Sequence, residues 1–140
     1  MSDLDQDIMF TLVREPIFLT ETHIAGLRYT PDLGDIMAGI KEGTTLRAFL
    51  EVDNEYDEDA VVIVDDKDRK VGHVPRPSNR IIANLIRAGK DIECEVEAVG
   101  TLKGEPNVRI SIYMMESRPS GRGSIDAAPR FSATPETANL

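Results

Sequence analysis

Short stretches in which apolar and polar residues alternate recur through this 140-residue chain, and they constrain its fold more than any other feature. In 45–52, four apolar residues fall on one side of an extended backbone, while Arg47, Phe49 and Glu51 fall on the other. The four are Leu46, Ala48, Leu50 and Val52. A period of two is typical of a strand with one buried face. Comparable apolar runs and turn residues predict further strands at 16–22, 60–64, 69–74, 92–102 and 108–115.

One longer stretch has the period of a helix instead. Between 78 and 88, four apolar residues form a single stripe, and Gly89 follows as a terminator. A short helix is expected near 32–40, where Pro31 suits the first turn. The main helix would bridge the two hairpins formed by the last four strands. This order predicts a mainly β, α+β fold with two helices: a small, partly open, OB-like β-barrel of about six strands.

The predicted barrel occupies 15–116 as one domain, after a polar lead-in at 1–14. The stretch 117–140 is rich in Ser, Pro, Gly, Ala and Thr without periodicity, so we expect a flexible tail. The single cysteine, Cys94, continues the alternation of its strand and is expected in the core. Neither a signal peptide nor a membrane span is visible, so we expect a cytoplasmic protein that does not bind membranes.

Acidic residues outnumber basic ones, and the formal net charge is -9. A surface that grips nucleic acid everywhere is therefore excluded, because such binding grows with the number of phosphates that cations neutralise. Any contact with nucleic acid has to be local.

The loop 53–61 concentrates polar chemistry in one short segment. It carries the amide of Asn54, the phenol of Tyr56 and the carboxylate of Asp57. A carboxylate accepts hydrogen bonds, so Asp57 favours a terminal hydroxyl, which donates, and repels a phosphate at the same point. The residues alone also allow a structural interpretation, in which Asn54 and Asp57 only form the turn and the Tyr56 ring covers the barrel rim.

Positive charge stands in two other segments. His73 and Arg76 belong to Val-Gly-His-Val-Pro-Arg at 71–76, and Arg28 precedes Tyr29 early in the chain. The forked donors of arginine suit phosphate oxygens. The Tyr29 ring could stack on an unpaired base, a contact worth about 1 to 3 kcal/mol. His73 could instead be half-buried and satisfied by a backbone carbonyl.

In order and spacing, the segments at 25–29, 53–61 and 71–76 resemble the HIRAN domain, and the match runs over about 17–115. They read Ala-Gly-Leu-Arg-Tyr, Asp-Asn-x-Tyr-Asp-x-x-Ala-Val and Val-Gly-His-Val-Pro-Arg. In the best-described member of the family, the helicase-like transcription factor, this domain captures the 3′-hydroxyl end of single-stranded DNA. The resemblance implies DNA contacts through seven residues: Arg28 and Tyr29 on phosphate and base, Asn54, Tyr56 and Asp57 around the terminal nucleotide, and His73 and Arg76 on the backbone.

Three positions depart from the family pattern. Glu55 stands where the family usually has proline, and Thr30 replaces a second aromatic residue. Val108 lies near the place of an aromatic in the last hairpin. The resemblance implies an accessory or recruitment subunit for a separate helicase or nuclease in DNA repair, since the family's ATPase is not part of this sequence.

Catalysis has little support in the sequence. An EF-hand counted from Asp53 would need glycine and glutamate where Glu58 and Val64 stand. A magnesium nuclease would require four side chains to converge: Asp57, Asp59, Asp65 and His73. No phosphate-binding glycine loop, zinc spacing or nucleophile elbow is visible, so we expect no enzyme, metal or cofactor. The alternative to DNA binding is an acidic scaffold that binds a basic partner protein or mimics DNA.

Overall fold

The computed structural model describes residues 12–119. Most of the expected lead-in, 1–14, and of the expected tail, 117–140, lies outside the described residues. The chain divides into a main unit, 16–115, and a second unit formed from 1–15 and 116–140. The site lies in the main unit.

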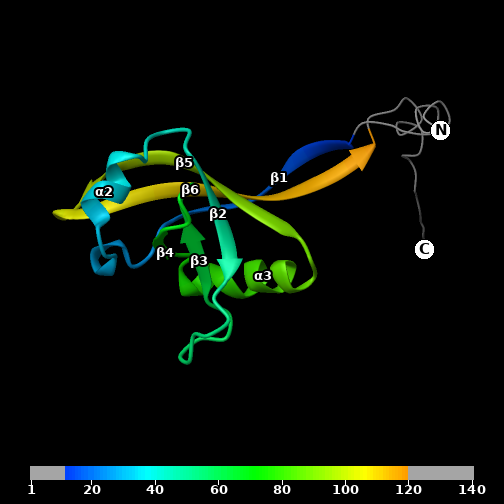
Figure 1. Ribbon diagram of the computed structural model, residues 1–140, viewed down its shortest axis with the longest axis horizontal. Coiled ribbons are helices and arrows are strands. Elements are labelled where there is room, and N and C mark those ends of the chain that lie inside the picture. Colours follow the sequence, from blue (N-terminus) through cyan, green and yellow to red (C-terminus); the bar gives the residue numbers. More distant parts are fainter. Residues whose placement is uncertain (1–11, 120–140) are drawn as a thin grey trace. The chain divides into compact units, whose positions relative to one another are not determined.

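The described residues form a six-stranded sheet (Figure 1). Its order is β1-β6-β5-β2-β3-β4, and the pairs β2–β3, β2–β5, β3–β4 and β5–β6 are antiparallel. The mainly β, partly open barrel expected from the alternation is confirmed, including the main helix between two hairpins. The strands are β1 Leu12–His23, β2 Thr45–Leu50, β3 Val61–Val64, β4 Lys70–His73, β5 Asp91–Leu102 and β6 Glu105–Pro119.

Two strands are longer than their alternation indicated. β1 begins at Leu12 rather than at residue 16, and β6 covers more than 108–115. The first residues of β1 include Arg14, Glu15 and Pro16, which give no apolar face to detect. A strand that is held by pairing with a neighbour rather than by burial leaves only a weak pattern in the sequence.

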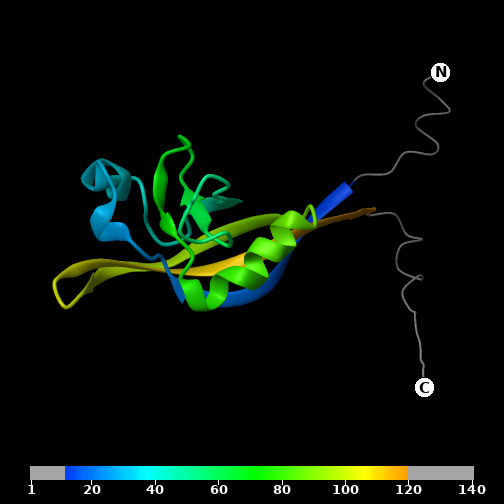
Figure 2. The same cartoon turned by 90° about the horizontal axis from the view of Figure 1, so that it is seen from below.

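Three helical segments accompany the sheet. They are η1 Leu27–Tyr29, α2 Leu33–Ala38 and α3 Arg76–Arg87. α3 packs on β2, β3 and β5, and it runs away from η1 and α2 (Figures 1 and 2). None of the helices between residues 12 and 119 has the length and apolar character that a membrane crossing requires.

The main helix differs from the prediction at two points. α3 begins at Arg76 rather than at residue 78, because Pro77 falls in the first turn, where a missing N–H breaks no helical hydrogen bond. Ile82 is buried, but Ile81, which the apolar stripe assigned to the same face, is 70% exposed. The side of α3 that carries Ile81 therefore faces solvent.

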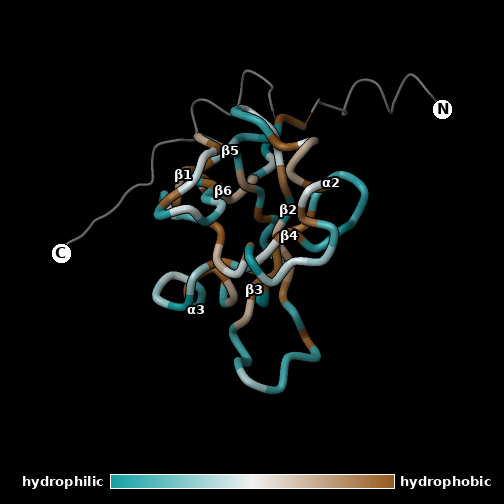
Figure 3. Tube along the Cα trace, turned by 90° about the vertical axis from the view of Figure 1, so that its left-hand side faces the viewer, coloured by the Kyte–Doolittle hydropathy of each residue, from teal (hydrophilic) through white to brown (hydrophobic). Residues whose placement is uncertain are grey.

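The connection between β2 and β3 projects from the sheet as a mostly hydrophilic loop (Figure 3). It runs through 51–60, immediately after the strand that carries Leu46 and Ala48 into the core. The expected strand 45–52 is therefore too long: β2 ends at Leu50, and Val52, which the alternation assigned to the buried face, is 86% exposed in the loop. The exposed part of the loop includes Tyr56, whose side chain contributes no core surface.

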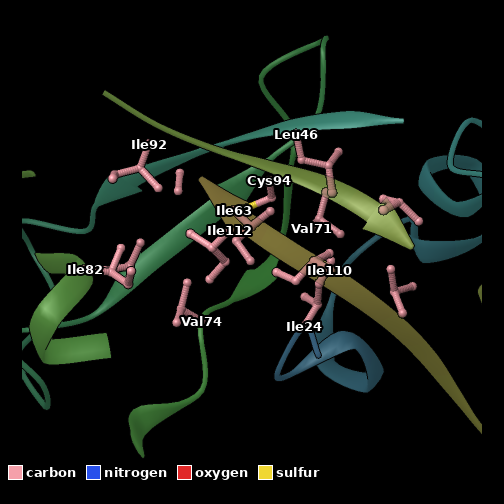
Figure 4. Packing of buried hydrophobic residues seen from close by; sticks show 14 of the residues in the cluster. Ile24, Leu46, Ile63, Val71, Val74, Ile82, Ile92, Cys94, Ile110 and Ile112 are labelled. Atoms are coloured by element: carbon pink, nitrogen blue, oxygen red, sulfur yellow. The ribbon is translucent and has the colours of Figure 1, made fainter. Parts of the chain in front are cut away.

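A single cluster of buried apolar side chains fills the inner face of the sheet (Figure 4). Cys94 belongs to it, as the alternation predicted, and burial raises the pKa of its thiol to about 12. The thiol is therefore protonated and unreactive at neutral pH. The largest fully buried side chains are Leu46, Ile63, Ile82, Ile92, Ile110 and Ile112.

The chain that follows β1 partly closes the barrel. The Ile24 N–H donates to the Val108 carbonyl at 2.9 Å, while Ala25 and His73 exchange backbone hydrogen bonds of 2.8 and 2.9 Å. Residue 72 has to be glycine here, because a Cβ at Gly72 would lie 2.6 Å from the Ala25 carbonyl oxygen. This close approach fixes the end of β4, where His73 stands.

Candidate nucleic-acid interface

Five of the seven residues implied by the resemblance line one hollow of about 230 Å³ in the main unit. We call it the Tyr56 hollow. It lies between the loop 51–60, the end of β4 and the first turn of α3. The five residues are Asn54, Tyr56, Asp57, His73 and Arg76.

Asn54 shapes the loop from within. Its Oδ1 accepts hydrogen bonds from the backbone N–H groups of Tyr56, at 2.8 Å, and Asp57, at 2.9 Å. Its Nδ2 donates to Oε1 of Glu51 at 2.9 Å. Asn54 thus forms the turn, one of the two interpretations that its residue type allowed, and it sets the direction of the two side chains that follow.

Asp57 is an ionised acceptor at the wall of the hollow. Its Oδ1 accepts from the Asp59 N–H at 2.9 Å, and its Oδ2 accepts from Nδ2 of Asn79 at 2.9 Å. Nε of Arg76 lies 3.3 Å from the same Oδ2. The hydrogen bonds from Asp59 and Asn79, with the charge of Arg76, lower the pKa of Asp57. A carboxylate offers about four acceptor positions, so Asp57 keeps capacity for a ligand.

The Tyr56 ring is available for stacking. The side chain belongs to a residue that is 88% exposed, and its backbone carbonyl accepts a hydrogen bond from Nη2 of Arg76 at 3.2 Å. The alternative interpretation, in which this ring covers the core at the barrel rim, is therefore wrong. An aromatic ring in this position offers both faces to a planar ligand.

Glu51 organises the site, although it was not among the seven residues that the resemblance implied. Its Oε1 lies 2.8 Å from Nε2 of His73, and its Oε2 accepts from Nζ of Lys70 at 3.0 Å. Burial alone would raise the pKa of Glu51, but hydrogen bonds from Asn54, His73 and Lys70 lower it to about 2. At the end of an alternating strand, Glu51 resembled a solvated outward residue. Its partners on β4 appear only when the hairpin is formed.

Tyr29 lines a neighbouring hollow of about 510 Å³, which we call the Tyr29 hollow. His73 lines both hollows and so connects Tyr29 to the other site residues. The Arg28 guanidinium lies 5.3 Å from the centroid of the Tyr29 ring, as in a cation–π pair. Arg28 lines neither hollow, and its contact with Tyr29 places it next to the Tyr29 hollow. Lys70 adds positive charge to the Tyr29 hollow.

The HIRAN domain family matches residues 17–116 of the sequence. This chain belongs to the HIRAN family. A protein from Lactobacillus plantarum has the same fold, with a TM-score of 0.68 at 20% identity, over 74% of this chain and 99% of that one. The HIRAN domain of human HLTF gives a TM-score of 0.57 at 16% identity, over 73% of this chain and 78% of that one. No curated protein matches.

HIRAN membership confirms the resemblance on which the seven residues were chosen, and it implies nucleic-acid binding with single-stranded DNA as the ligand. The family is a binding domain. Which residues of this HIRAN domain contact DNA stays a prediction. The residues that line the two hollows are the candidates.

Two of the three departures from the family pattern have structural roles in this HIRAN domain. Thr30 donates through Oγ1 to the Val71 carbonyl at 2.6 Å. Val108 is fully buried and accepts the hydrogen bond from Ile24 that helps close the barrel. Neither position offers an aromatic surface, and the aromatic residues that line the two hollows are Tyr29 and Tyr56.

The acidic side chains considered for a nuclease are engaged by cations and N–H groups. Asp59 accepts from Nε of Arg80 at 3.0 Å and from Nη1 of Arg87 at 2.9 Å, and these hydrogen bonds lower its pKa. Asp65 accepts from the N–H and Nε of Arg69 within its own turn. Within residues 12–119, no three His, Cys, Asp or Glu side chains are placed to hold a metal ion.

Proposed function

We propose that this HIRAN domain captures the 3′-hydroxyl end of single-stranded DNA in the Tyr56 hollow. The observation that carries the proposal is that one wall presents the Asp57 carboxylate while the rim carries Tyr56, His73 and Arg76. A terminal hydroxyl donates a hydrogen bond to Asp57, whereas a phosphate at the same place meets its negative charge. Because the pKa of Asp57 is lowered, the discrimination operates at neutral pH.

The proposed path of the strand uses both hollows. The terminal base stacks on Tyr56, and its phosphate lies near Arg76 and His73. The preceding base reaches Tyr29 across His73, which lines both hollows, and Arg28 contacts its phosphate. Two stacked bases, worth about 1 to 3 kcal/mol each, with two or three phosphate contacts support a dissociation constant on the order of micromolar and a strong dependence on salt.

The proposal extends to the cellular role. A small domain that holds a DNA terminus supplies location rather than chemistry, so we assign it to the recruitment of a separate helicase or nuclease in DNA repair. Co-purification of a nucleic-acid-processing enzyme with the tagged chain, in extracts treated with DNase, tests this role. An association that disappears after DNase treatment would contradict a direct protein contact.

Fluorescence anisotropy with three single-stranded oligonucleotides of one sequence tests the central proposal. They end in a 3′-hydroxyl, a 3′-phosphate and a blocked, interior-like 3′ group. We expect the hydroxyl end to bind about ten-fold more tightly than the other two, because only it can donate to a carboxylate without bringing negative charge. Equal affinity for the three ends would refute end capture while leaving single-strand binding in place.

A second candidate is an acidic scaffold for a basic protein partner. Asp53 and Glu55 favour it, since both are exposed and make no ion pair within 12–119. Their charge would attract a basic surface. This candidate expects no anisotropy response to any of the three oligonucleotides and a stable complex with a basic protein, so the same experiment separates the two functions.

A further inference from the structure

A row of arginines continues from the Tyr56 hollow along α3. Arg76, Arg80 and Arg87 are separated by four and seven residues, which brings them to one face of a helix with 3.6 residues per turn. The row is about 16 Å long at a rise of about 1.5 Å per residue. Because α3 runs away from α2 and from η1, which ends at Tyr29, the row leads from Arg76 away from these two elements (Figures 1 and 2).

Loop carboxylates hold these arginines in place. Oδ2 of Asp57 lies 3.3 Å from Nε of Arg76, and Oδ2 of Asp59 accepts from Nε of Arg80 at 3.0 Å. A contact through Nε leaves the terminal nitrogens of a guanidinium for another partner. The Arg80 side chain is 77% exposed and makes no second hydrogen bond among the described residues. An arginine that is already oriented loses less conformational entropy when it binds phosphate.

Arg87 and Arg80 have different structural roles within the row. Arg87 donates to Oδ1 of Asp59 at 2.9 Å, to Oδ1 of Asn84 at 2.9 Å and to the Glu58 carbonyl at 2.6 Å, so it fastens the loop to α3. Arg80 has the single contact with Asp59. One nearly buried carboxylate, Asp59, thus contacts two guanidinium groups, and Glu58 and Asp57 add negative charge near Arg80 that raises its pKa further.

We propose that this arginine row, with Arg80 at its centre, binds the phosphate backbone of a second DNA strand that continues past the captured 3′ end. The inference rests on the proposed function. A strand whose terminus lies at Asp57 and whose preceding nucleotide lies toward Tyr29 has no phosphate along α3 beyond Arg76. Only a strand that does not end in the hollow reaches Arg80. The preferred substrate is then an unpaired 3′ end on a longer complement.

The test compares one fluorescent 3′-hydroxyl oligonucleotide in three forms: alone, annealed to a complement that stops at the same point, and annealed to a complement that continues single-stranded. Mismatches keep the 3′ end unpaired in both annealed forms. We expect the continuing complement to bind about five-fold more tightly than the stopped one. Arg80→Gln should remove this difference, lower the salt slope for the continuing form by about one and leave the single strand unaffected.

Lys41→Gln is the matched control, because it removes the same charge from an exposed side chain without an ion pair in the described part of the chain. It should preserve the five-fold difference. Arg80→Lys, which keeps the charge but loses the fork, should retain part of it and serves as the second variant if Arg80→Gln does not fold. An intermediate difference in Arg80→Lys then supports the inference, and an unchanged one contradicts it.

Two results would overturn the inference. One is equal affinity of the wild-type chain for the stopped and continuing complements. The other is a loss in Arg80→Gln that is equal for all three forms, which would assign Arg80 to the end site or to the fold. Failure of the proposed function looks different, because the wild-type chain would then show no preference for a 3′-hydroxyl over a 3′-phosphate on the single strand.

Discussion

Two acidic connections flank β3, and they use similar residues for different purposes. In the turn 65–69, the Asp65 side chain finds its partners locally: Oδ1 accepts from the N–H groups of Lys67, at 3.0 Å, and Arg69, at 2.8 Å, and Oδ2 accepts from Nε of Arg69 at 2.9 Å. Each bond lies within five consecutive residues. The carboxylate therefore stabilises a tight hairpin.

The loop 51–60 directs its acidic groups outward to distant elements. Glu51 meets His73 and Lys70 on β4, while Asp57 and Asp59 meet side chains of α3. Acidic content alone therefore does not indicate a site. In the turn, the Asp65 carboxylate satisfies its own backbone and Asp68 pairs with Arg47 of β2. In the loop, the carboxylates contact cations from β4 and α3, and an aromatic ring is left in solvent.

Tyr56→Ala should give the largest effect. Removing the ring deletes one stacking platform, so we expect affinity for a single-stranded 3′-hydroxyl oligonucleotide to fall by about ten-fold or more, in line with about 1 to 3 kcal/mol per stacked base. Thermal stability should stay unchanged because the residue is 88% exposed. Anisotropy and thermal melting measure the two quantities.

Phe49→Ala is the control from the other region. The Phe49 ring lies 5.5 Å from the guanidinium of Arg47, which donates to the Asp65 carbonyl and pairs with Asp68 in the turn. The substitution Phe49→Ala removes an exposed aromatic ring near the turn 65–69, and the affinity for the 3′-hydroxyl oligonucleotide should not change. If both substitutions weaken binding equally, the ligand is not confined to the Tyr56 hollow.

Asp65→Ala should separate stability from binding. The substitution leaves two backbone N–H groups and Arg69 without their acceptor in a nearly buried position, which costs about 2 kcal/mol of unfolding free energy. Affinity for DNA should remain that of the wild-type chain. Denaturant unfolding and anisotropy test the two statements. Weaker DNA binding by the folded variant would place the turn in the interface.

Much of the fold could be predicted because it depends on local periodicity. The alternation around Cys94 and Leu46 predicted buried positions that the structure confirms. The stripe of α3 was predicted less well, since Ile81 satisfies the helical period but faces solvent. Periodicity reports which residues can share a face. It does not report how far the neighbouring strands extend over that face.

The site was predictable only where residue types carry the chemistry. Tyr56 and Asp57 stood out because a phenol and a carboxylate in one loop suit recognition of a polar end, and the structure places both at one hollow. Glu51, Arg80 and Arg87 did not stand out. Their partners on other elements lie 19 to 29 residues away, as in the contacts of Glu51 with Lys70 and of Arg87 with the Glu58 carbonyl, and such pairings arise only from the tertiary fold.

Asp57→Asn tests whether a single negative charge in the loop 51–60 distinguishes a 3′-hydroxyl from a 3′-phosphate. The amide oxygen can take the place of Oδ1 and accept from the Asp59 N–H, so the turn of the loop should be kept, whereas the amide nitrogen replaces the Oδ2 acceptor of Asn79. The negative charge that repels a terminal phosphate is lost. We expect the preference for a 3′-hydroxyl over a 3′-phosphate to fall from about ten-fold to near one. A preserved preference would mean that other groups read the terminus.

Glu51→Gln should have the smallest effect at neutral pH, and its effect on stability should appear when the pH is lowered. Its pKa is about 2 in the folded chain, against 4.5 for an ordinary glutamate. A depressed pKa means that the ionised group stabilises the fold above about pH 4.5 and loses this contribution as the pH falls toward 2. Glu51→Gln should therefore flatten the pH dependence of unfolding in this interval.

Because Glu51 also holds His73 and Asn54, the same variant should loosen the Tyr56 hollow and weaken DNA binding modestly at pH 7. Urea unfolding at several pH values measures the first effect, and a pH profile identical to that of the wild-type chain would show that the contacts of Glu51 do not stabilise the folded state.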